Sequence, residues 1–402
     1  MQQHFPSPLV PIFAALLALA ALWPAQPADA PAALLTRTPD ASESEPLFLS
    51  ERRIAYLRAP KGRAGLQWSR ELWLMDEDGR RNRRVLGEGC FHLRPSASGR
   101  QRLACSRYSD VRAVVHAGRT EGWEARTAIW AFSLPDARPQ RVAGPGAVFL
   151  DGWTQDDRIA FHEGLLGYDD VQGFHEATGF PPPRAWLAPF GRAAGASRLD
   201  PSRQPRFADR GLDREQLATV GVWAPDGSGC IRARWYERDG RPRIGYDFIQ
   251  PGRPPRRVLE TEEHLTYSEE PWTPAVVWAD KRRVLLGRFV SRPDPRLPQS
   301  RGRFYLVLVH PGSGAFRVLA PEVPMAPSPD PVVSPGDWRV LFRGCEPDGS
   351  PGLWVVTVDG PYCRRILAGE ASYTPWAWSL DGRSLVISRP EEGGCDLWRI
   401  DL

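Results

Sequence analysis

The stretch Trp378–Ser388 reads WSLDGRSLVIS, which is an apolar segment, an Asp-Gly pair and a second apolar segment. Asp-Gly between two such segments is a strong signal for a β-hairpin with a tight turn. Related segments recur along the chain, and each of them predicts one hairpin. They are FLSERRIAYL from Phe48, RPSASGRQRLACS from Arg94, WTQDDRIAF from Trp153, WAPDGSGCI from Trp223, WADKRRVLL from Trp278 and SPGDWRVLF from Ser334.

A second recurring segment follows each hairpin. ELWLMDEDGRRNRRVL from Glu71 and GLWVVTVDGPYCRRIL from Gly352 each contain a strand, a turn rich in Gly, Pro or Asp, and a strand that begins basic and ends apolar. Further copies begin near residues 128, 185, 243, 304 and 396. A hairpin and the segment after it make four short strands, which is one blade of a β-propeller.

Seven such units can be counted, and they recur about every 54 residues, which suits a blade with loop insertions. We therefore predict an all-β fold, a single β-propeller of seven four-stranded blades over residues 31–402. Six blades is the alternative.

The ends of the repeat predict how the ring closes. The last unit stops after its third strand, and Ala32–Thr36 (AALLT) has the pattern of the missing fourth strand. We expect this N-terminal strand to cross to the last blade and pair there. Closure of this kind covers a sheet edge that would otherwise be open to association with other chains.

The motif W-S-x-D-G-R-x-L-x-x-S at Trp378, followed by D-L-W-x-x-D-L at Asp396, resembles the TolB-type (WD-repeat-like) β-propeller repeat. The resemblance covers nearly all of residues 45–402 and implies a propeller fold and export. TolB-like propellers usually have six blades, so seven departs from that pattern. The extra N-terminal domain of TolB has no counterpart between Ala30 and the first blade, so a role in the Tol–Pal system is not implied.

Residues 1–30 read as a secretory signal peptide. Leu9–Trp23 is an uncharged apolar run, shorter than the roughly 20 residues that span a bilayer. Ala28-Asp29-Ala30 fits a cleavage site after Ala30. The alternative is a buried N-terminal helix. We expect a periplasmic or secreted protein with no membrane span after cleavage.

Charge argues against a nucleic-acid partner. The chain has 402 residues with Lys+Arg 52 and Asp+Glu 48, a formal net charge of +4. Lys61 and Lys281 are the only lysines, and the arginines are spread among nearly as many acidic residues. This pattern is typical of a solvated mixed surface rather than a patch that follows phosphates.

No catalytic or metal-binding motif stands out. No G-x-S-x-G nucleophile motif occurs. Phe161-His162-Glu163 and Phe174-His175-Glu176 repeat a small motif, but they lack the spacing that would aim their side chains at one ion. We read them as solvated loop residues and expect no metal and no cofactor.

Six cysteines suit an oxidising compartment. Cys90 and Cys105 flank a predicted hairpin turn at equal distance, so we expect them to face one another and form a disulfide, with free thiols as the alternative. Buried free thiols are the reading for Cys230, Cys345, Cys363 and Cys395.

Long insertions predict the binding surface. Loops between second and third strands, and connections between blades, emerge on one face of a propeller, and the insertions of this chain fall there. We expect the opposite face to have turns too short to form a pocket. Tolerated, partly disordered insertions are the alternative. The candidate ligand-binding residues on the insertions are Trp123, Tyr168, Asp169, Asp170, Phe174 and His175.

Two functions remain open. The first is a non-catalytic, monomeric binding or scaffold propeller of the cell envelope, which contacts a protein or glycan through its loop-rich face. The alternative is a propeller enzyme, a polysaccharide lyase or hydrolase with a site in the central channel. The sequence names no convergent catalytic set, and this favours the first.

Overall fold

The computed structural model describes most of residues 32–402. The residues outside the description are 1–31, 51, 64–66, 97–99, 117–118, 155–156, 165, 170–172, 177–183, 191–195, 199–220, 263–275, 291–302, 322, 324–330, 337, 346–349, 361, 370–375 and 392–393.

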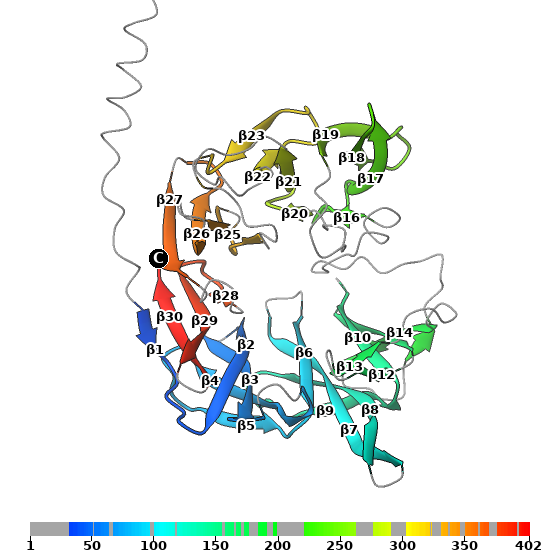
Figure 1. The fold of residues 1–402 in the computed structure, drawn as a ribbon, viewed down its shortest axis with the longest axis vertical. Coiled ribbons are helices and arrows are strands. Elements are labelled where there is room, and N and C mark those ends of the chain that lie inside the picture. Colours follow the sequence, from blue (N-terminus) through cyan, green and yellow to red (C-terminus); the bar gives the residue numbers. More distant parts are fainter. Residues whose placement is uncertain are drawn as a thin grey trace, which may run out of the picture.

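The described residues form seven four-stranded antiparallel sheets, arranged around a common centre (Figure 1). In the order in which the blades are given below, the first strand of each blade is the innermost. The predicted seven blades are therefore confirmed. Blades one to three are β2 (Ala41–Leu49), β3 (Arg53–Pro60), β4 (Glu71–Asp76) and β5 (Arg83–Leu86); β6 (Cys90–Pro95), β7 (Arg102–His116), β8 (Arg119–Ser133) and β9 (Gln140–Gly146); and β10 (Val148–Trp153), β11 (Arg158–Glu163), β14 (Arg184–Pro189) and β15 (Ser197–Arg198).

Blades four to seven follow the same order. They are β16 (Val222–Trp223), β17 (Cys230–Arg238), β18 (Arg241–Ile249) and β19 (Arg256–Glu262); β20 (Val276–Trp278), β21 (Val284–Val290), β22 (Arg303–Val309) and β23 (Phe316–Leu319); β24 (Val332–Val333), β25 (Arg339–Cys345), β26 (Pro351–Thr357) and β27 (Cys363–Ala368); and β28 (Trp376–Trp378), β29 (Ser384–Glu391), β30 (Gly394–Asp401) and β1 (Ala32–Leu34).

The N-terminal strand closes the ring as predicted. β1 is antiparallel to β30, with Ala32 opposite Ile400 and Leu34 opposite Trp398. The last blade thus takes three strands from the end of the described chain and its fourth from the beginning (Figure 1).

The Asp-Gly turn that decides the fold is held by short local hydrogen bonds. The Asp381 carboxylate accepts from the Ser379 hydroxyl (2.6 Å) and from the backbone N–H of Arg383 (3.0 Å). Gly382 has φ +66°, and a Cβ there would lie 2.9 Å from the Pro335 carbonyl oxygen. Glycine is required for both reasons.

A repeated tryptophan joins three of the inner strands to the blade before each of them. The indole N–H of Trp153 donates to the Arg94 carbonyl (2.9 Å), that of Trp278 to Val222 (3.0 Å), and that of Trp378 to Val332 (3.2 Å). Each acceptor lies on the inner strand of the preceding blade. A large apolar ring with one donor both fills the space between blades and satisfies a backbone carbonyl there.

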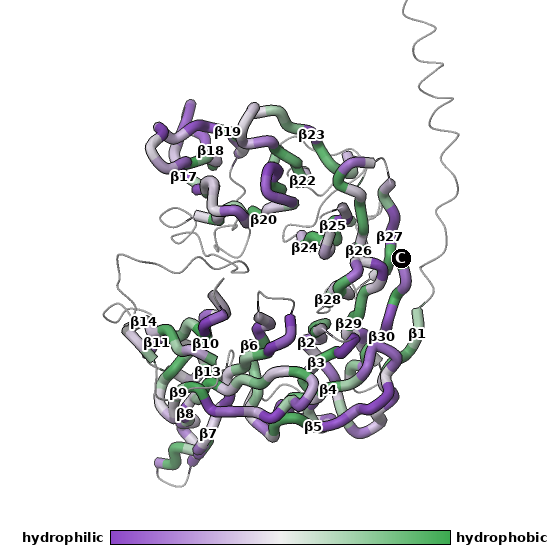
Figure 2. Tube along the Cα trace, turned by 180° about the vertical axis from the view of Figure 1, so that it is seen from behind, coloured by the Kyte–Doolittle hydropathy of each residue, from purple (hydrophilic) through white to green (hydrophobic). Residues whose placement is uncertain are grey.

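Hydrophobic clusters lie between neighbouring blades. One joins blade one to blade two, another blades two and three, a third blades four to six, and two more join blade seven to its neighbours. Polar residues gather at turns instead, as at the hydrophilic end of the β17–β18 hairpin (Figure 2). Within the described part of the chain, no helix is long and apolar enough to cross a membrane.

The expected facing of Cys90 and Cys105 is wrong. A β-bulge between Phe91 and Arg94 shifts the β6–β7 register, so Arg107 lies opposite Cys90 instead. Both cysteines are buried free thiols in the structure. The two side chains are still close to one another. A hydrogen bond with Cys90, together with burial, raises the pKa of the Cys105 thiol well above its ordinary value. Whether oxidation joins them stays a prediction.

Candidate functional site

The two predicted insertions in blades two and three are strands that lie together. β7 and β8 extend beyond the rest of their sheet as a long hairpin (Figure 1). β12 (Leu166–Asp169) and β13 (Gly173–Glu176) form a separate two-stranded sheet that packs against β8. The insertions therefore build a local structure of their own on the loop-rich face.

Three of the predicted binding residues come together with three further aromatic residues. We call the set Trp68, Phe91, Tyr108, Trp123, Tyr168 and Phe174 the aromatic cluster. Ring centroids are 5.1 Å apart for Trp68 and Trp123, and 5.2 Å for Tyr168 and Phe174. Aromatic pairs at such separations add roughly 0.5–1.5 kcal/mol each beyond burial.

The aromatic cluster has a buried layer and a partly exposed layer. Phe91, Tyr108 and Phe174 are buried, and Phe91 stacks on Tyr108 with centroids 4.1 Å apart. Trp68 and Trp123 are only partly buried, so their rings remain accessible above that layer. The arrangement is a rigid base that supports two indole rings, which suits contact with a partner.

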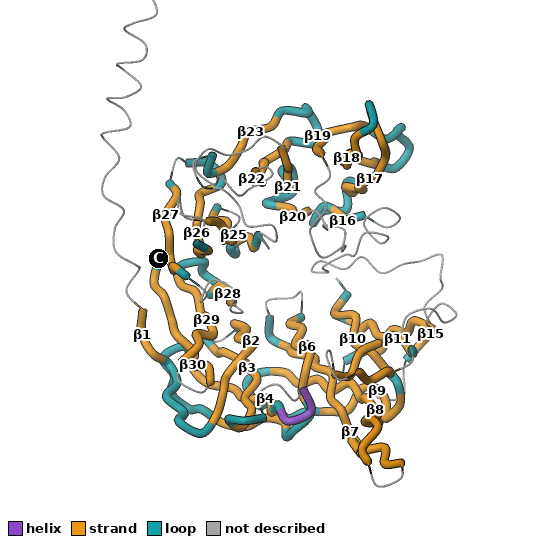
Figure 3. The backbone as a smooth tube through the Cα atoms, viewed as in Figure 1, coloured by secondary structure: helices purple, strands orange, loops and turns teal. Residues whose placement is uncertain are grey.

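Trp68, Phe91 and Tyr108 are the members outside the predicted set, and Trp68 is the least expected of them. Trp68 lies in the one-turn helix η1 (Gln67–Ser69), beside β4 and β6 (Figure 3). Its ring is 5.4 Å from that of Phe174, although neither a motif nor a long insertion marks it. A Trp just before a predicted strand of blade one was the only available signal.

Part of the predicted polar set is not described. Asp169 and His175 lie on β12 and β13, opposite Gly173 and Gly167 respectively, but their side chains fall outside the described atoms. Asp170 lies outside the described residues altogether. The structure thus brings together the aromatic half of the predicted set alone.

Three charged or titratable residues of the inner strands β2 and β6, together with Arg70 of the loop before β4, form a group near the aromatic cluster. We call Glu45, Arg70, His92 and Arg94 the inner-strand charged group. The Arg70 guanidinium donates to the Glu45 carboxylate (3.0 Å), and the His92 ring lies 4.9 Å from that of Phe91. Trp68 and Arg70, two residues apart, thus belong to the aromatic cluster and to the charged group respectively.

Two members of the charged group have an unusual backbone conformation. Glu45 on β2 has φ +51° and His92 on β6 has φ +50°, each at a β-bulge of an inner strand. Side chains other than glycine rarely adopt this left-handed region, and such strain is concentrated at functional sites. The bulges place two titratable side chains at equivalent positions on adjacent blades.

The surroundings of His92 disfavour its charged form. Desolvation by surrounding atoms, then the charges of Arg94 and Arg70, lower the pKa of His92 to about 4, although the residue is exposed. Burial raises the pKa of Glu45, and both arginines oppose that shift. The group therefore combines two guanidinium groups with an imidazole that is neutral at neutral pH and with the Glu45 carboxyl group.

Arg94 is the cation best placed to take a ligand anion. Its guanidinium donates to the Leu93 carbonyl (3.1 Å), and no ion pair joins it to a carboxylate of the described residues. Guanidinium groups bind carboxylates and phosphates in a fixed planar geometry. The group can therefore accept an anion beside an aromatic surface.

His162 has a partner within its own blade. Its Nδ1 lies 2.9 Å from Asp151 Oδ1, and its ring stacks on Phe149 with centroids 5.4 Å apart. Among the described residues, no group of three or more His, Cys, Asp and Glu side chains is arranged to hold a metal ion.

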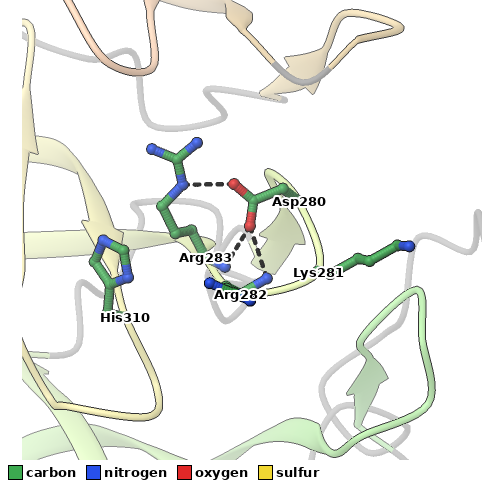
Figure 4. Close-up of a pocket in the computed structure, with 5 residues that line it drawn as sticks. All are labelled: Asp280, Lys281, Arg282, Arg283 and His310. Atoms are coloured by element: carbon green, nitrogen blue, oxygen red, sulfur yellow. Dashed lines mark hydrogen bonds and ion pairs between the residues drawn. The ribbon is translucent and has the colours of Figure 1, made fainter.

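The expectation that the short-turn face has no pocket is wrong. A cavity of about 430 Å³ lies there, lined by Asp280, Lys281, Arg282, Arg283 and His310 (Figure 4). The Asp280 carboxylate accepts from the backbone N–H groups of Arg282 and Arg283 and from Arg283 Nε, while Lys281 points away (Figure 4). The carboxylate caps the β20–β21 turn, and the cations do not converge on one point.

Comparisons with known proteins bear on the fold. No protein-family model matches the chain, and no curated protein matches it. An oligogalacturonate lyase in complex with manganese is similar in structure, with TM-score 0.51, 11% identity, and coverage of 94% of this chain and 96% of that one.

Two further solved structures are similar over most of this chain. The β-propeller domain of the trilobed protease from Pyrococcus furiosus has TM-score 0.47 and 14% identity over 91% of this chain and 95% of that one. TolB from Acinetobacter baumannii has TM-score 0.37 and 17% identity over 79% of this chain and 64% of that one. The chain spans 51% of the acylaminoacyl peptidase from Pyrococcus horikoshii, another match. The seven four-stranded sheets make the chain a β-propeller, and its likeness to these solved structures is one of fold alone.

Proposed function

We propose that this chain is an exported, non-catalytic binding propeller of the cell envelope that holds a protein or glycan partner at its loop-rich face. The observation that supports this most is the aromatic cluster beside the inner-strand charged group. Two partly buried tryptophans, Trp68 and Trp123, pack with a buried aromatic base, and Arg94 lies on β6, the strand that also carries Phe91 of that base.

The chemistry of the site indicates what the partner presents. An apolar face, such as that of a sugar ring or an aromatic side chain, would pack on the indoles. A carboxylate or another anion would pair with Arg94, where the neutral His92 imidazole adds a hydrogen bond without adding charge. We therefore expect a partner with an apolar surface and a negative group close together.

The enzyme alternative is less well supported. The likeness to the lyase is at 11% identity and concerns the fold, so it lends no activity to this chain. No reacting pair of nucleophile and base is placed by the contacts of the described residues around the aromatic cluster.

The test is capture of partners from an envelope extract on the immobilised protein, with Trp123→Ala and Arg94→Ala compared with the wild type. Both variants should lose at least about tenfold in affinity for the captured partner, because each removes a central contact. Arg282→Ala, on the opposite face, is the matched control and should bind as the wild type does. Equal capture by all four proteins would rule out this face as the site.

A further inference from the structure

Two carboxyl groups lie together where the N-terminal segment joins the ring. Glu43 of β2 and Asp396 of β30 both contact Thr36 and Thr38, on the segment between β1 and β2. The Thr36 hydroxyl lies 3.4 Å from Glu43 Oε2 and 3.5 Å from Asp396 Oδ1, and the Thr38 hydroxyl donates to Glu43 Oε1. We call these four residues the seam cluster.

The seam cluster is part of the closure itself. The backbone N–H of Leu397 donates to the Thr36 hydroxyl (2.8 Å), and that of Leu35 donates to the Leu397 carbonyl (2.8 Å). The Ser388 hydroxyl donates to the Glu43 carbonyl (2.7 Å). Strands of blades one and seven and the N-terminal segment are therefore tied together at this cluster.

The two carboxyl groups cannot both be charged here without a penalty. The Glu43 side chain is 0% exposed. The nearest cation is Arg58, whose Nε is 3.8 Å from Glu43 Oε1 and whose guanidinium also pairs with exposed Asp40 at 3.7 Å. Both carboxyl groups contact the Thr36 and Thr38 hydroxyls, so they lie close together, and a proton on one of them removes the repulsion between two negative charges.

Few other charges face Glu43. Arg58 and Tyr56 approach it from β3, Asp396 from β30, and the two threonines from the N-terminal segment. Tyr56 stays neutral, because burial raises the pKa of its hydroxyl and that hydroxyl donates to Asn82 (2.8 Å). Glu43 is therefore the group of this cluster whose charge changes near neutrality, since its pKa is raised to about 7.

We propose that the seam cluster makes closure of the ring responsive to pH, a device independent of the proposed binding function. With Glu43 protonated, the N-terminal strand is held against the last blade. Loss of that proton leaves a buried negative charge close to the partly buried Asp396 and weakens the hold.

The direction of the effect follows from linkage. Burial, as the largest cause, and the Asp396 charge raise the pKa of Glu43 from 4.5 to about 7. The folded protein therefore keeps a proton that the unfolded chain releases above pH 4.5. The contribution of Glu43 to stability is complete below about pH 4.5 and is lost as the pH rises to about 7.

The first experiment compares melting temperatures of the wild type and Glu43→Gln across pH 4.5 to 8. Glutamine mimics the neutral carboxyl group, so this variant cannot lose the proton. Relative to the variant, the wild type should lose about 2–5 °C as the pH rises through this range. Asp40→Asn, which also removes a carboxylate near Arg58 but an exposed one, should follow the wild-type profile.

The second experiment locates the effect. Hydrogen exchange in peptides that cover β1, corrected for the intrinsic pH dependence, should show protection that falls between about pH 4.5 and pH 7 in the wild type and not in Glu43→Gln. Peptides from β17 and β18, across the ring (Figure 1), should show no such difference. Should Glu43→Gln fail to fold, Asp396→Asn replaces it and should shift the wild-type transition to lower pH. The proposal would be overturned if the pH profile of Glu43→Gln, or of Asp396→Asn where it replaces that variant, coincided with the wild-type profile.

Discussion

Leu34 and Trp398 lie directly opposite each other across the last sheet, although they belong to the first and last strands of the described chain. Deletion of residues 31–38 should therefore lower the melting temperature by several degrees, because the last blade loses its fourth strand and the seam cluster loses both threonines. Differential scanning calorimetry measures this. Deletion of residues 1–30 alone is the control and should leave the transition in place; equal melting of both deletions would contradict the closure argument.

Oxidation should join Cys90 and Cys105, whose side chains already meet. Mass spectrometry of peptides under non-reducing conditions should find the linked pair in protein recovered from an oxidising compartment. The bond would close a loop of about 15 residues and add roughly 3 kcal/mol to the free energy of unfolding. Two free thiols in that protein would refute this prediction.

The Trp378 indole contributes a hydrogen bond to the Val332 carbonyl as well as apolar contact. Trp378→Phe keeps an aromatic ring but leaves that carbonyl without its donor. We expect a loss of about 1–3 kcal/mol in the free energy of unfolding by urea titration. Trp338→Phe is the control, since Trp338 is 40% exposed, and it should change stability by under about 0.5 kcal/mol.

Alanine substitutions in the aromatic cluster should lower the free energy of unfolding more at buried members than at partly buried ones. Phe174→Ala should lower the free energy of unfolding by about 3 kcal/mol, because Phe174 is 4% exposed and supports both Tyr108 and Tyr168. Trp123→Ala should cost clearly less stability, because its ring is only partly buried. Chemical denaturation of both variants decides the matter, and equal losses would contradict the two-layer description.

Export should remove residues 1–30. N-terminal sequencing of protein recovered from the periplasm or medium of an expressing cell should begin at Pro31. Replacement of Ala28 and Ala30 by bulky residues should leave the leader attached. A mature protein that keeps its leader would favour the alternative of a buried N-terminal helix.

Local patterns predicted most of the fold. The Asp381–Gly382 turn determines its hairpin through bonds made within a few residues, and a repeat multiplies that signal along the chain. The pairing of Ala32–Leu34 with β30 was predictable because the last repeat unit lacked its fourth strand and an extra strand preceded the first unit. Repetition made long-range pairing visible in the sequence.

Features that depend on a local irregularity were not predictable. The bulge between Phe91 and Arg94 shifts the register around Cys90 and gives His92 its left-handed conformation. No residue pattern in this segment predicts the bulge. Trp68 joined Trp123 through a contact between blades, which a repeat read one unit at a time does not show. The cavity at Asp280 arises from side chains around a short turn, whose length alone suggested no space.

The pairing of β1 with β30 also determines when the ring can close during synthesis of the chain. A chain made from its N-terminus carries the closing strand β1 before blades one to six, but its partner β30 is made after all of them. Blades one to six can form their own hairpins early, whereas the join between blades seven and one must wait. Until then Leu35 and the apolar face of blade one stay uncovered, so the interval before completion is when this protein is most exposed to proteolysis and misassembly.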